Sequence, residues 1–289
     1  MRTADRTIRR WVPPLMLVIA LAAGVARAQG YLPADVLPEQ FRDVGIDERL
    51  DQPLPLDATF TDSEGKQVRL GDYFQTGKPA LLALVYYRCP MLCTLVVNGM
   101  MDAARQIDWT PGNGPDNQYQ MLVISFDAAE TPELAARKKR VYVDAFGRVG
   151  AAGGMHFLVG SKQSVDRLTQ AVGFKYKWDE KNGQFVHAAA IYAVTPAGHL
   201  SKYLFGVRYD PTTVRLALVE ASSGKIGTIS DKIWLMCSHY NPKEGTYAAS
   251  AVKIMNLSAP GAAAAILVIL GLVMHNRRKK RLQNTHETP

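Results

Sequence analysis

Two cysteines separated by three residues are the part of this sequence with the clearest chemical potential. Cys89 and Cys93 lie within Leu81–Met101, which begins as an apolar run rich in Leu, Val and Tyr and so predicts a buried strand. Pro90 has no backbone N–H and a fixed φ, so it suits the first turn of a helix that we expect to continue to about Ile107. Cys89 is thus expected where a strand ends and a helix begins.

The spacing of this pair permits two kinds of chemistry. Residues four apart on a helix share one face, with Cβ atoms roughly 5–6 Å apart. Cys89 and Cys93 could therefore form a disulfide, whose Cα span is about 4.4–6.8 Å, or bind a soft ion such as Cu(I) as two thiolates. The helix N-terminus favours ionisation of Cys89. Two half-buried cysteines with no role remain the alternative, because a Cys-x-x-x-Cys pair alone is a weak signal.

The N-terminus has the three parts of a secretory signal peptide. Residues 1–10 carry four Arg and one Asp, an apolar run follows at Trp11–Val25, and Ala26-Arg27-Ala28 completes a small-x-small cleavage pattern. We therefore expect 1–28 to be a signal peptide that is removed after Ala28. The alternative is an uncleaved anchor, although this run is short for a span of roughly 20 residues.

The middle of the chain predicts one α/β domain at 57–225, preceded by a polar, proline-containing arm at 29–56 that lies extended on its surface. Strand and helix patterns alternate through the domain, and this order predicts a parallel core sheet extended by antiparallel strands. The expected elements are a hairpin at 58–70 with a helical turn at 70–74, strands at 81–87, 120–126, 156–159, 186–195 and 199–205, and helices at 90–107, 131–146, 161–172 and 209–221.

The C-terminal part of the chain contains a candidate membrane span. Residues 254–274 carry no charge, and at about 1.5 Å per residue they just cross a hydrocarbon core of roughly 30 Å. Five consecutive cations follow at Arg277–Arg281, so the positive-inside rule places this end in the cytoplasm and the domain outside. We expect a juxtamembrane segment at 226–253, a transmembrane helix at 254–274 and a basic cytoplasmic tail at 275–289. A buried core helix is the alternative.

The formal net charge of +8 is concentrated at the two ends of the chain. Residues 1–28 contain five Arg and one Asp, and residues 275–289 contain five cations and one Glu, so each end carries +4. The segment between them is close to neutral. The positive charge therefore indicates a membrane address, and no nucleic-acid partner is expected.

Other cysteine and histidine residues differ in their promise as ligands. Cys237 and His239 form a Cys-x-His pair between the domain and the predicted span, where they could be auxiliary ligands or a packed thiol beside a loop histidine. His156 begins an apolar strand and is expected to be a satisfied core residue, whereas His199 is expected to be exposed. Two histidines belong to the predicted tail and are not site candidates, His275 and His286.

Two chemical motifs of this chain resemble those of the Sco/SenC family. Cys89-Pro90-Met91-Leu92-Cys93 resembles the CPxxC copper motif of that family. Val186-His187, followed by Ala190-Ile191-Tyr192, is similar to its HSxxIYLIDPxG hairpin. The resemblance extends over residues 50–225 or so, in order and at plausible spacing.

Two segments between these motifs also match. Ile124–Asp127 followed by Glu130-Thr131-Pro132 looks like the strand and DTPE-like helix entry of the family, and Met155–Gly160 resembles its HFLTG strand. The chain departs from the family where DPERDTP is shortened by one residue to Asp127–Pro132, so the Asp that some members place near copper is not carried over. It also departs in its expected tether, which is C-terminal instead of an N-terminal helix.

The resemblance implies a thioredoxin-like fold, a central mixed sheet flanked by helices, and copper binding through Cys89, Cys93 and His187. Two thiolates suit Cu(I), and an added imidazole suits Cu(II). The family serves assembly of the binuclear copper site of cytochrome c oxidase. The implied partners are the oxidase copper-site subunit and a copper donor or thiol reductant, with the domain on the periplasmic side of a bacterial inner membrane.

Thiol–disulfide exchange is the main alternative function. Cys89 would then attack a partner disulfide and Cys93 would resolve the mixed intermediate, so that both are redox-active residues. His187 separates the two functions, because copper binding needs it and dithiol exchange does not. A peroxidase of the same fold is a third alternative.

Overall fold

The computed structural model describes residues 43–223, 228, 230–231, 235, 238–241 and 246–249. The predicted signal peptide, the predicted span at 254–274, the tail at 275–289 and Cys237 lie outside these described residues. Within the described ranges, no helix combines the length and the apolarity needed to cross a membrane.

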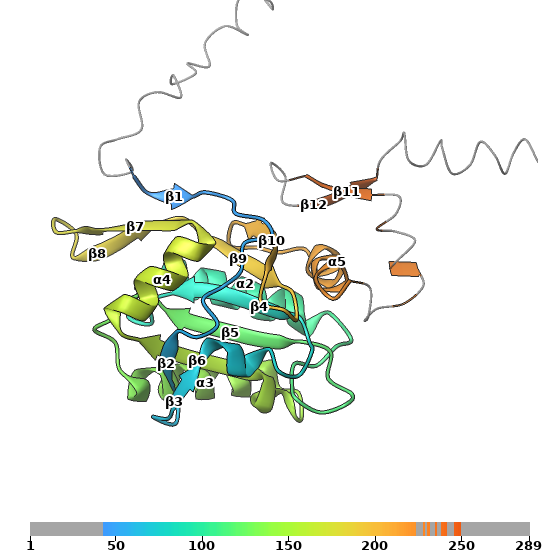
Figure 1. Ribbon diagram of the computed structural model, residues 1–289, viewed down its shortest axis with the longest axis horizontal. Helices are drawn as coiled ribbons and strands as arrows, with labels where there is room; N and C mark the ends of the chain where they lie inside the picture. The colour runs from blue at the N-terminus through green and yellow to red at the C-terminus, as the bar shows by residue number, and fades with distance from the viewer. Residues whose placement is uncertain are drawn as a thin grey trace, which may run out of the picture. The chain divides into compact units, whose positions relative to one another are not determined.

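Seven strands form the central sheet, in the spatial order β10-β9-β4-β5-β6-β2-β3 (Figure 1). The strands β4 and β5 are buried along their whole length, as expected for apolar strands covered on both faces. The parallel centre consists of β4 (Ala80–Val85), β5 (Gln120–Ser125) and β6 (Met155–Gly160). The antiparallel flanks are β9 (Ala190–Val194) and β10 (Leu200–Phe205) beside β4, and β2 (Thr59–Asp62) and β3 (Gln67–Arg69) beside β6.

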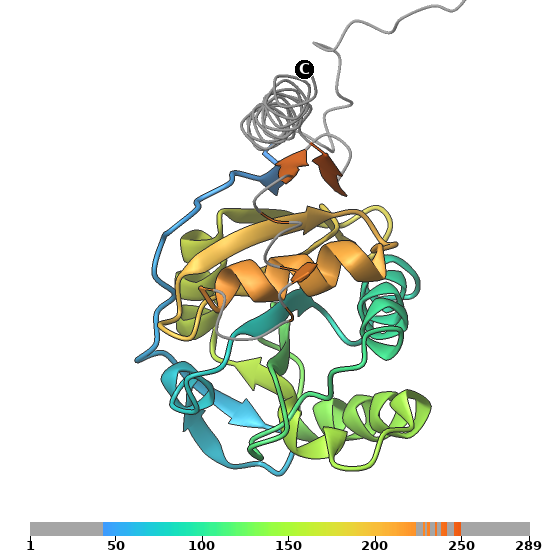
Figure 2. The same cartoon turned by 90° about the vertical axis from the view of Figure 1, so that its right-hand side faces the viewer.

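Helices cover both faces of this sheet (Figures 1 and 2). Because β4, β5 and β6 are neighbours in chain order, right-handed crossovers place the connecting helices α2 and α3 on one face, and α5 packs against α2 there. The chain returns from β6 toward β9 through α4, which lies on the opposite face. The bounds are α2 (Leu92–Arg105), α3 (Pro132–Phe146), α4 (Lys162–Val172) and α5 (Pro211–Ala221), with short 3-10 turns η3 (Leu70–Tyr73) and η4 (Ala151–Gly154).

The starts of α3 and α4 follow signals in the sequence, with one exception in detail. Ser161 accepts the N–H of Ser164 at 3.2 Å and so caps α4 as predicted. Pro132 occupies the first turn of α3, also as predicted. Thr131 stands at the N-cap position of α3, but its side chain makes no cap hydrogen bond and bonds with the Glu133 carboxylate instead. The predicted capping bond of Thr131 is therefore wrong, although the helix begins where expected.

A second sheet corrects the prediction of one continuous strand over 186–195. That segment breaks at 188–189, because its first half pairs with an additional strand at 174–179 and its second half joins the central sheet. The additional strand has the sequence FKYKWD, whose alternation of aromatic and charged residues is typical of a half-buried strand. The second sheet has the order β1-β7-β8, with β1 (Gly45–Ile46), β7 (Phe174–Asp179) and β8 (Gln184–His187).

The described part of the arm, residues 43–56, lies extended against the domain. Its first strand, β1, pairs with β7, and farther along the N–H of Asp51 donates to the Leu200 carbonyl at 2.8 Å. His199, expected to be exposed, is half-buried because its Nδ1 bonds with the Asp51 carbonyl at 2.9 Å. The arm thus braces both the edge strand β10 and the hairpin that ends at His187.

A small two-stranded sheet follows the domain, made of β11 (Ser238–Asn241) and β12 (Thr246–Ala249). His239 lies in β11, whereas Cys237 is outside the described residues. The Cys237–His239 ligand pair therefore stays a prediction. The main domain has the mixed α/β architecture that the sequence indicated, with a thioredoxin-like arrangement of a central mixed sheet flanked by helices.

Candidate metal centre

Cys89, Cys93 and His187 come together beside the C-terminal end of β4. Cys89 closes the turn after that strand, Cys93 is the second residue of α2, and His187 is the last residue of β8. Their ligand atoms all lie within 4.8 Å of one another, and all three side chains are buried. The fold therefore unites residues that are as many as 98 positions apart in the sequence, from 89 to 187.

The two cysteines do not share a helix face, which corrects the prediction from their spacing. α2 begins at Leu92, with Met91 at its N-cap position, so Pro90 precedes the helix instead of forming its first turn. Cys89 lies outside the helix, and its sulfur accepts a hydrogen bond from the N–H of Cys93 at 3.3 Å. This sulfur therefore takes the place of a capping side chain for one of the free N–H groups at the helix start.

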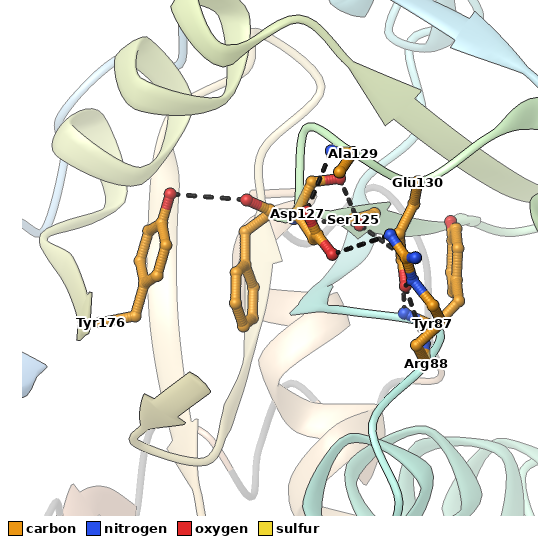
Figure 3. A network of polar contacts seen from close by, with 8 residues as sticks. Tyr87, Arg88, Ser125, Asp127, Ala129, Glu130 and Tyr176 are labelled. Atoms are coloured by element: carbon orange, nitrogen blue, oxygen red, sulfur yellow. Dashed lines mark hydrogen bonds and ion pairs between the residues drawn. The ribbon is translucent and has the colours of Figure 1, made fainter. Parts of the chain in front are cut away.

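Side chains, not a neighbouring strand, hold the turn between β4 and α2. The N–H of Tyr86 donates to Cys93 Sγ at 3.2 Å. The next two N–H groups, of Tyr87 and Arg88, each donate to the Glu130 carboxylate at 2.7 Å (Figure 3). Three consecutive amides are thus bound by one ligand sulfur and one carboxylate.

Glu130 is the residue of this site that the sequence did not reveal. Its side chain is completely buried and also accepts a hydrogen bond from Ser125 Oγ at 2.7 Å. Arg88 Nε lies 3.5 Å from it, and the same guanidinium pairs with Asp127 at 3.2 Å (Figure 3). The available signal was topological: Glu130 follows β5, the parallel neighbour of β4, and the carboxyl ends of parallel neighbours meet at one edge of a sheet.

The two thiols have opposite electrostatic environments. Hydrogen bonds with the Cys93 and His187 side chains and with the backbone of Cys93 and Met91 lower the pKa of Cys89 to about 3, against the opposing effect of burial. Burial raises the pKa of Cys93 far above its ordinary value, and the Cys89 side chain and the Glu130 carboxylate act in the same direction. Cys89 is therefore the thiolate of the pair, as its place at a helix start predicted, and Cys93 is the thiol.

His187 presents its Nε2 atom to the cysteines. Its Nδ1 lies 2.8 Å from the carbonyl of Ala188, which can only accept, so Nδ1 carries the ring proton. Nε2 then has a free lone pair and lies 3.3 Å from Cys93 Sγ. A hydrogen bond of this kind fixes the tautomer of metal-binding histidines. Three aromatic rings hold the imidazole, those of Phe126 at 5.2 Å, Phe174 at 5.9 Å and Tyr86 at 6.1 Å between centroids.

This donor set fits a soft or borderline metal ion. Two sulfurs and one imidazole nitrogen suit Cu(I) and, with the nitrogen bound, Cu(II); Zn²⁺ accepts the same atom types. The group lies close to solvent, because Arg88, Pro90 and Met91 around Cys89 are exposed. A cavity of about 460 Å³ adjoins the turn, and its lining includes Tyr86, Pro90, Trp178 and Phe185.

His156 lies apart from this group, as expected for a satisfied core histidine. It is half-buried in β6, where its Nε2 bonds with Gln120 Oε1 at 2.9 Å and its ring packs on Tyr73 at 4.3 Å. Burial lowers the pKa of His156 to about 4. It has the role of a neutral packing residue.

A thioredoxin-like domain with a buried Cys-Cys-His group defines the class of this protein. The chain belongs to the SCO1/SenC family, whose family model matches residues 48–220. This match confirms the family resemblance that the sequence motifs indicated. A comparison with curated protein sequences finds no match.

Several solved structures of Sco proteins match this chain. The chain is similar to a protein from Aquifex aeolicus VF5, with 22% identity, a TM-score of 0.53 and coverage of 61% of this chain and 96% of that one. It is also similar to Bradyrhizobium japonicum ScoI with copper bound (22% identity, 61% and 99% coverage, TM-score 0.41). A third is BsSco, a member of the Sco family of cytochrome c oxidase assembly proteins (18% identity, 62% and 99% coverage, TM-score 0.44).

Proposed function

We propose that this protein binds copper through Cys89, Cys93 and His187 and serves the assembly of the copper site of cytochrome c oxidase. The observation that carries the proposal is the convergence of two sulfurs and one imidazole nitrogen within 4.8 Å, in a chain of the SCO1/SenC family. The donor set suits copper in both of its common oxidation states. In this function copper is cargo that the protein receives and passes on.

The protonation of the group determines how copper is received. Cys89 offers a thiolate without losing a proton, and His187 offers the free lone pair of Nε2. Cys93, whose pKa is raised chiefly by burial, must first release its thiol proton. Loading therefore releases a proton from Cys93, and protonation of Cys93 favours release of the ion.

Metal analysis of the reduced full-length protein tests this function. We expect about one copper per chain and preference for copper over zinc when both are offered. Cys93→Ser removes one of the two sulfur donors and is expected to weaken Cu(I) binding by more than about 100-fold. This exceeds the loss typical of replacing a residue that only contacts a metal ligand. Cys237→Ser is measured beside it. We expect an unchanged stoichiometry, and a reduced one would identify Cys237 as the auxiliary ligand that its Cys-x-His spacing suggested. Zinc preference, or full copper binding by Cys93→Ser, would contradict the proposal.

A second candidate function, thiol–disulfide exchange, is favoured by the unequal pKa values of the two thiols. The Cys89 thiolate attacks one sulfur of a partner disulfide, and the other partner sulfur leaves as a thiolate. Cys93 then loses its proton and attacks Cys89 Sγ, which frees the second partner thiolate and leaves a Cys89–Cys93 disulfide. Two electrons pass to the partner, so a thiol reductant must restore the pair before another cycle.

We further propose that the domain is periplasmic and held in the inner membrane by the segment 254–274. The support is the signal-peptide pattern of residues 1–28 and the cations that follow residue 274. Alkaline phosphatase, which is active only after export, is expected to be inactive when fused after residue 281 and active when fused after residue 225. N-terminal sequencing should find a mature chain that begins near Gln29. Phosphatase activity of the fusion after residue 281 would refute this topology.

A further inference from the structure

The Glu130 carboxylate binds the turn that carries Cys89, although it is not one of the three candidate ligands. We propose that Glu130 is a positioning residue that fixes this turn, so that the two sulfurs and His187 Nε2 are already assembled before a metal ion or a partner disulfide arrives. The inference deepens the proposed function and rests on it where copper is concerned.

Each oxygen of this carboxylate has its own set of donors. Oε1 accepts the N–H of Arg88 at 2.7 Å and lies 3.5 Å from Arg88 Nε. Oε2 accepts the N–H of Tyr87 at 2.7 Å and Ser125 Oγ at 2.7 Å. Two adjacent backbone amides therefore need two acceptor oxygens at a fixed separation, which a carboxylate has and a carboxamide lacks. Negative charge alone would not hold both amides.

The constraint on this turn reaches both sulfurs. Arg88 directly precedes Cys89, so a hydrogen bond that fixes the Arg88 amide also restricts the backbone position of Cys89. Tyr86 directly precedes Tyr87, and its own N–H donates to Cys93 Sγ at 3.2 Å. A turn that loosens at residues 87–88 would therefore displace one ligand sulfur and remove a hydrogen bond from the other.

Glu130 is itself held by regular structure. Ser125, its hydroxyl partner, is the last residue of β5, and Glu130 lies two residues before Pro132, where α3 begins. Its own N–H donates to the Asp127 carbonyl at 3.1 Å. Residues anchored in this way, on elements beside the ligands, hold a site in the geometry that it needs for binding.

The test compares Glu130→Gln with Glu133→Gln in the full-length reduced protein. Gln keeps the shape of Glu130 but turns an NH2 group toward one of the two amides. Glu133 is exposed and bonds with Thr131, so its replacement removes the same charge from the same helix start without touching the turn. Amide hydrogen exchange is measured without metal, with the Leu204 amide in β10 as reference, and the Cu(II)–thiolate absorption is then recorded.

We expect Glu130→Gln to accelerate exchange at Tyr87 and Arg88 by at least about tenfold relative to Leu204, because hydrogen bonds to charged groups are lost. Exchange at Tyr86 should also rise, and the Cu(II)–thiolate band should shift or weaken. Glu133→Gln should match the wild type in all of these. Glu130→Asp keeps the charge but is one methylene shorter, and is expected to behave like Glu130→Gln.

Several results would overturn the positioning role. These are wild-type exchange in Glu130→Gln, faster exchange with an unchanged Tyr86 amide, an unchanged Cu(II)–thiolate band, or wild-type behaviour of Glu130→Asp. Should Glu130→Gln fail to fold, Ser125→Ala frees one carboxylate oxygen from its anchor and must still accelerate exchange at Tyr87. A wild-type protein that binds no copper refutes the proposed function, but the exchange at Tyr86, Tyr87 and Arg88 still decides this inference.

Discussion

Replacing His187 by alanine is expected to abolish the Cu(II)–thiolate absorption band and to leave Cu(I) bound to Cys89 and Cys93. Cu(I) is satisfied by soft thiolate ligands, whereas Cu(II) prefers nitrogen in a tetragonal arrangement. Nε2 of His187 faces the sulfurs with a free lone pair and is the candidate nitrogen ligand of the group. The effect is measured by titrating the variant with Cu(I) and with Cu(II). We expect the Cu(II) affinity to fall by more than about 100-fold, which is the upper end of the loss seen when a residue that only contacts a metal ligand is replaced.

His199→Ala is the matched control for this variant. His199 is another histidine beside a strand, half-buried where His187 is buried, but its ring bonds with the Asp51 carbonyl and lies outside the Cys-Cys-His group. Its replacement should preserve the Cu(II) spectrum. In cells, His187→Ala should block oxidase assembly while the Cys89–Cys93 dithiol still cycles. An unchanged Cu(II) spectrum and affinity in His187→Ala would remove this residue from the site and favour thiol–disulfide exchange as the main role.

The parallel core of the fold could be predicted because its signals are local. The apolar runs at 81–87 and 120–126 are buried on both faces, and turn or cap residues separate them from the helices that follow. The start of α2 was less predictable. Pro90 permits a helix to begin, but the Cys89 sulfur binds the Cys93 amide and so delays the first helical residue to Leu92.

The third candidate ligand, His187, shows where local signals end. Cys89 and Cys93 attract attention through their spacing, whereas His187 was singled out only by the family resemblance. Its position depends on the strand break at 188–189 and on the pairing of β8 with β7, and this pairing is set by a strand outside the segment around His187. The buried role of Glu130 was equally hidden, since its main partners are backbone amides, which leave no pattern in a sequence.

Oxidation of Cys89 and Cys93 to a disulfide is expected to abolish copper binding reversibly. The two sulfurs belong to a group whose ligand atoms lie within 4.8 Å, and one is a thiolate while the other is a thiol. An oxidant such as diamide takes two electrons from the pair and one proton from the Cys93 thiol, and its second proton comes from water. The disulfide bond formed leaves no thiolate to bind copper. An oxidising compartment would thus set the fraction of protein able to accept copper through the redox state of this pair.

Copper stoichiometry before and after oxidation measures this control of binding by redox state. We expect about one copper per reduced chain, almost none after diamide, and full recovery after a thiol reductant. In Cys237→Ser the same cycle should persist, because the Cys89–Cys93 disulfide forms without Cys237. In Cys93→Ser, diamide cannot form the Cys89–Cys93 disulfide. Any Cu(I) binding that remains in this variant should therefore not be abolished by diamide through that bond, as it is in the wild type. A diamide-oxidised protein with a demonstrated Cys89–Cys93 disulfide and full copper content would show that binding does not need the two thiolates.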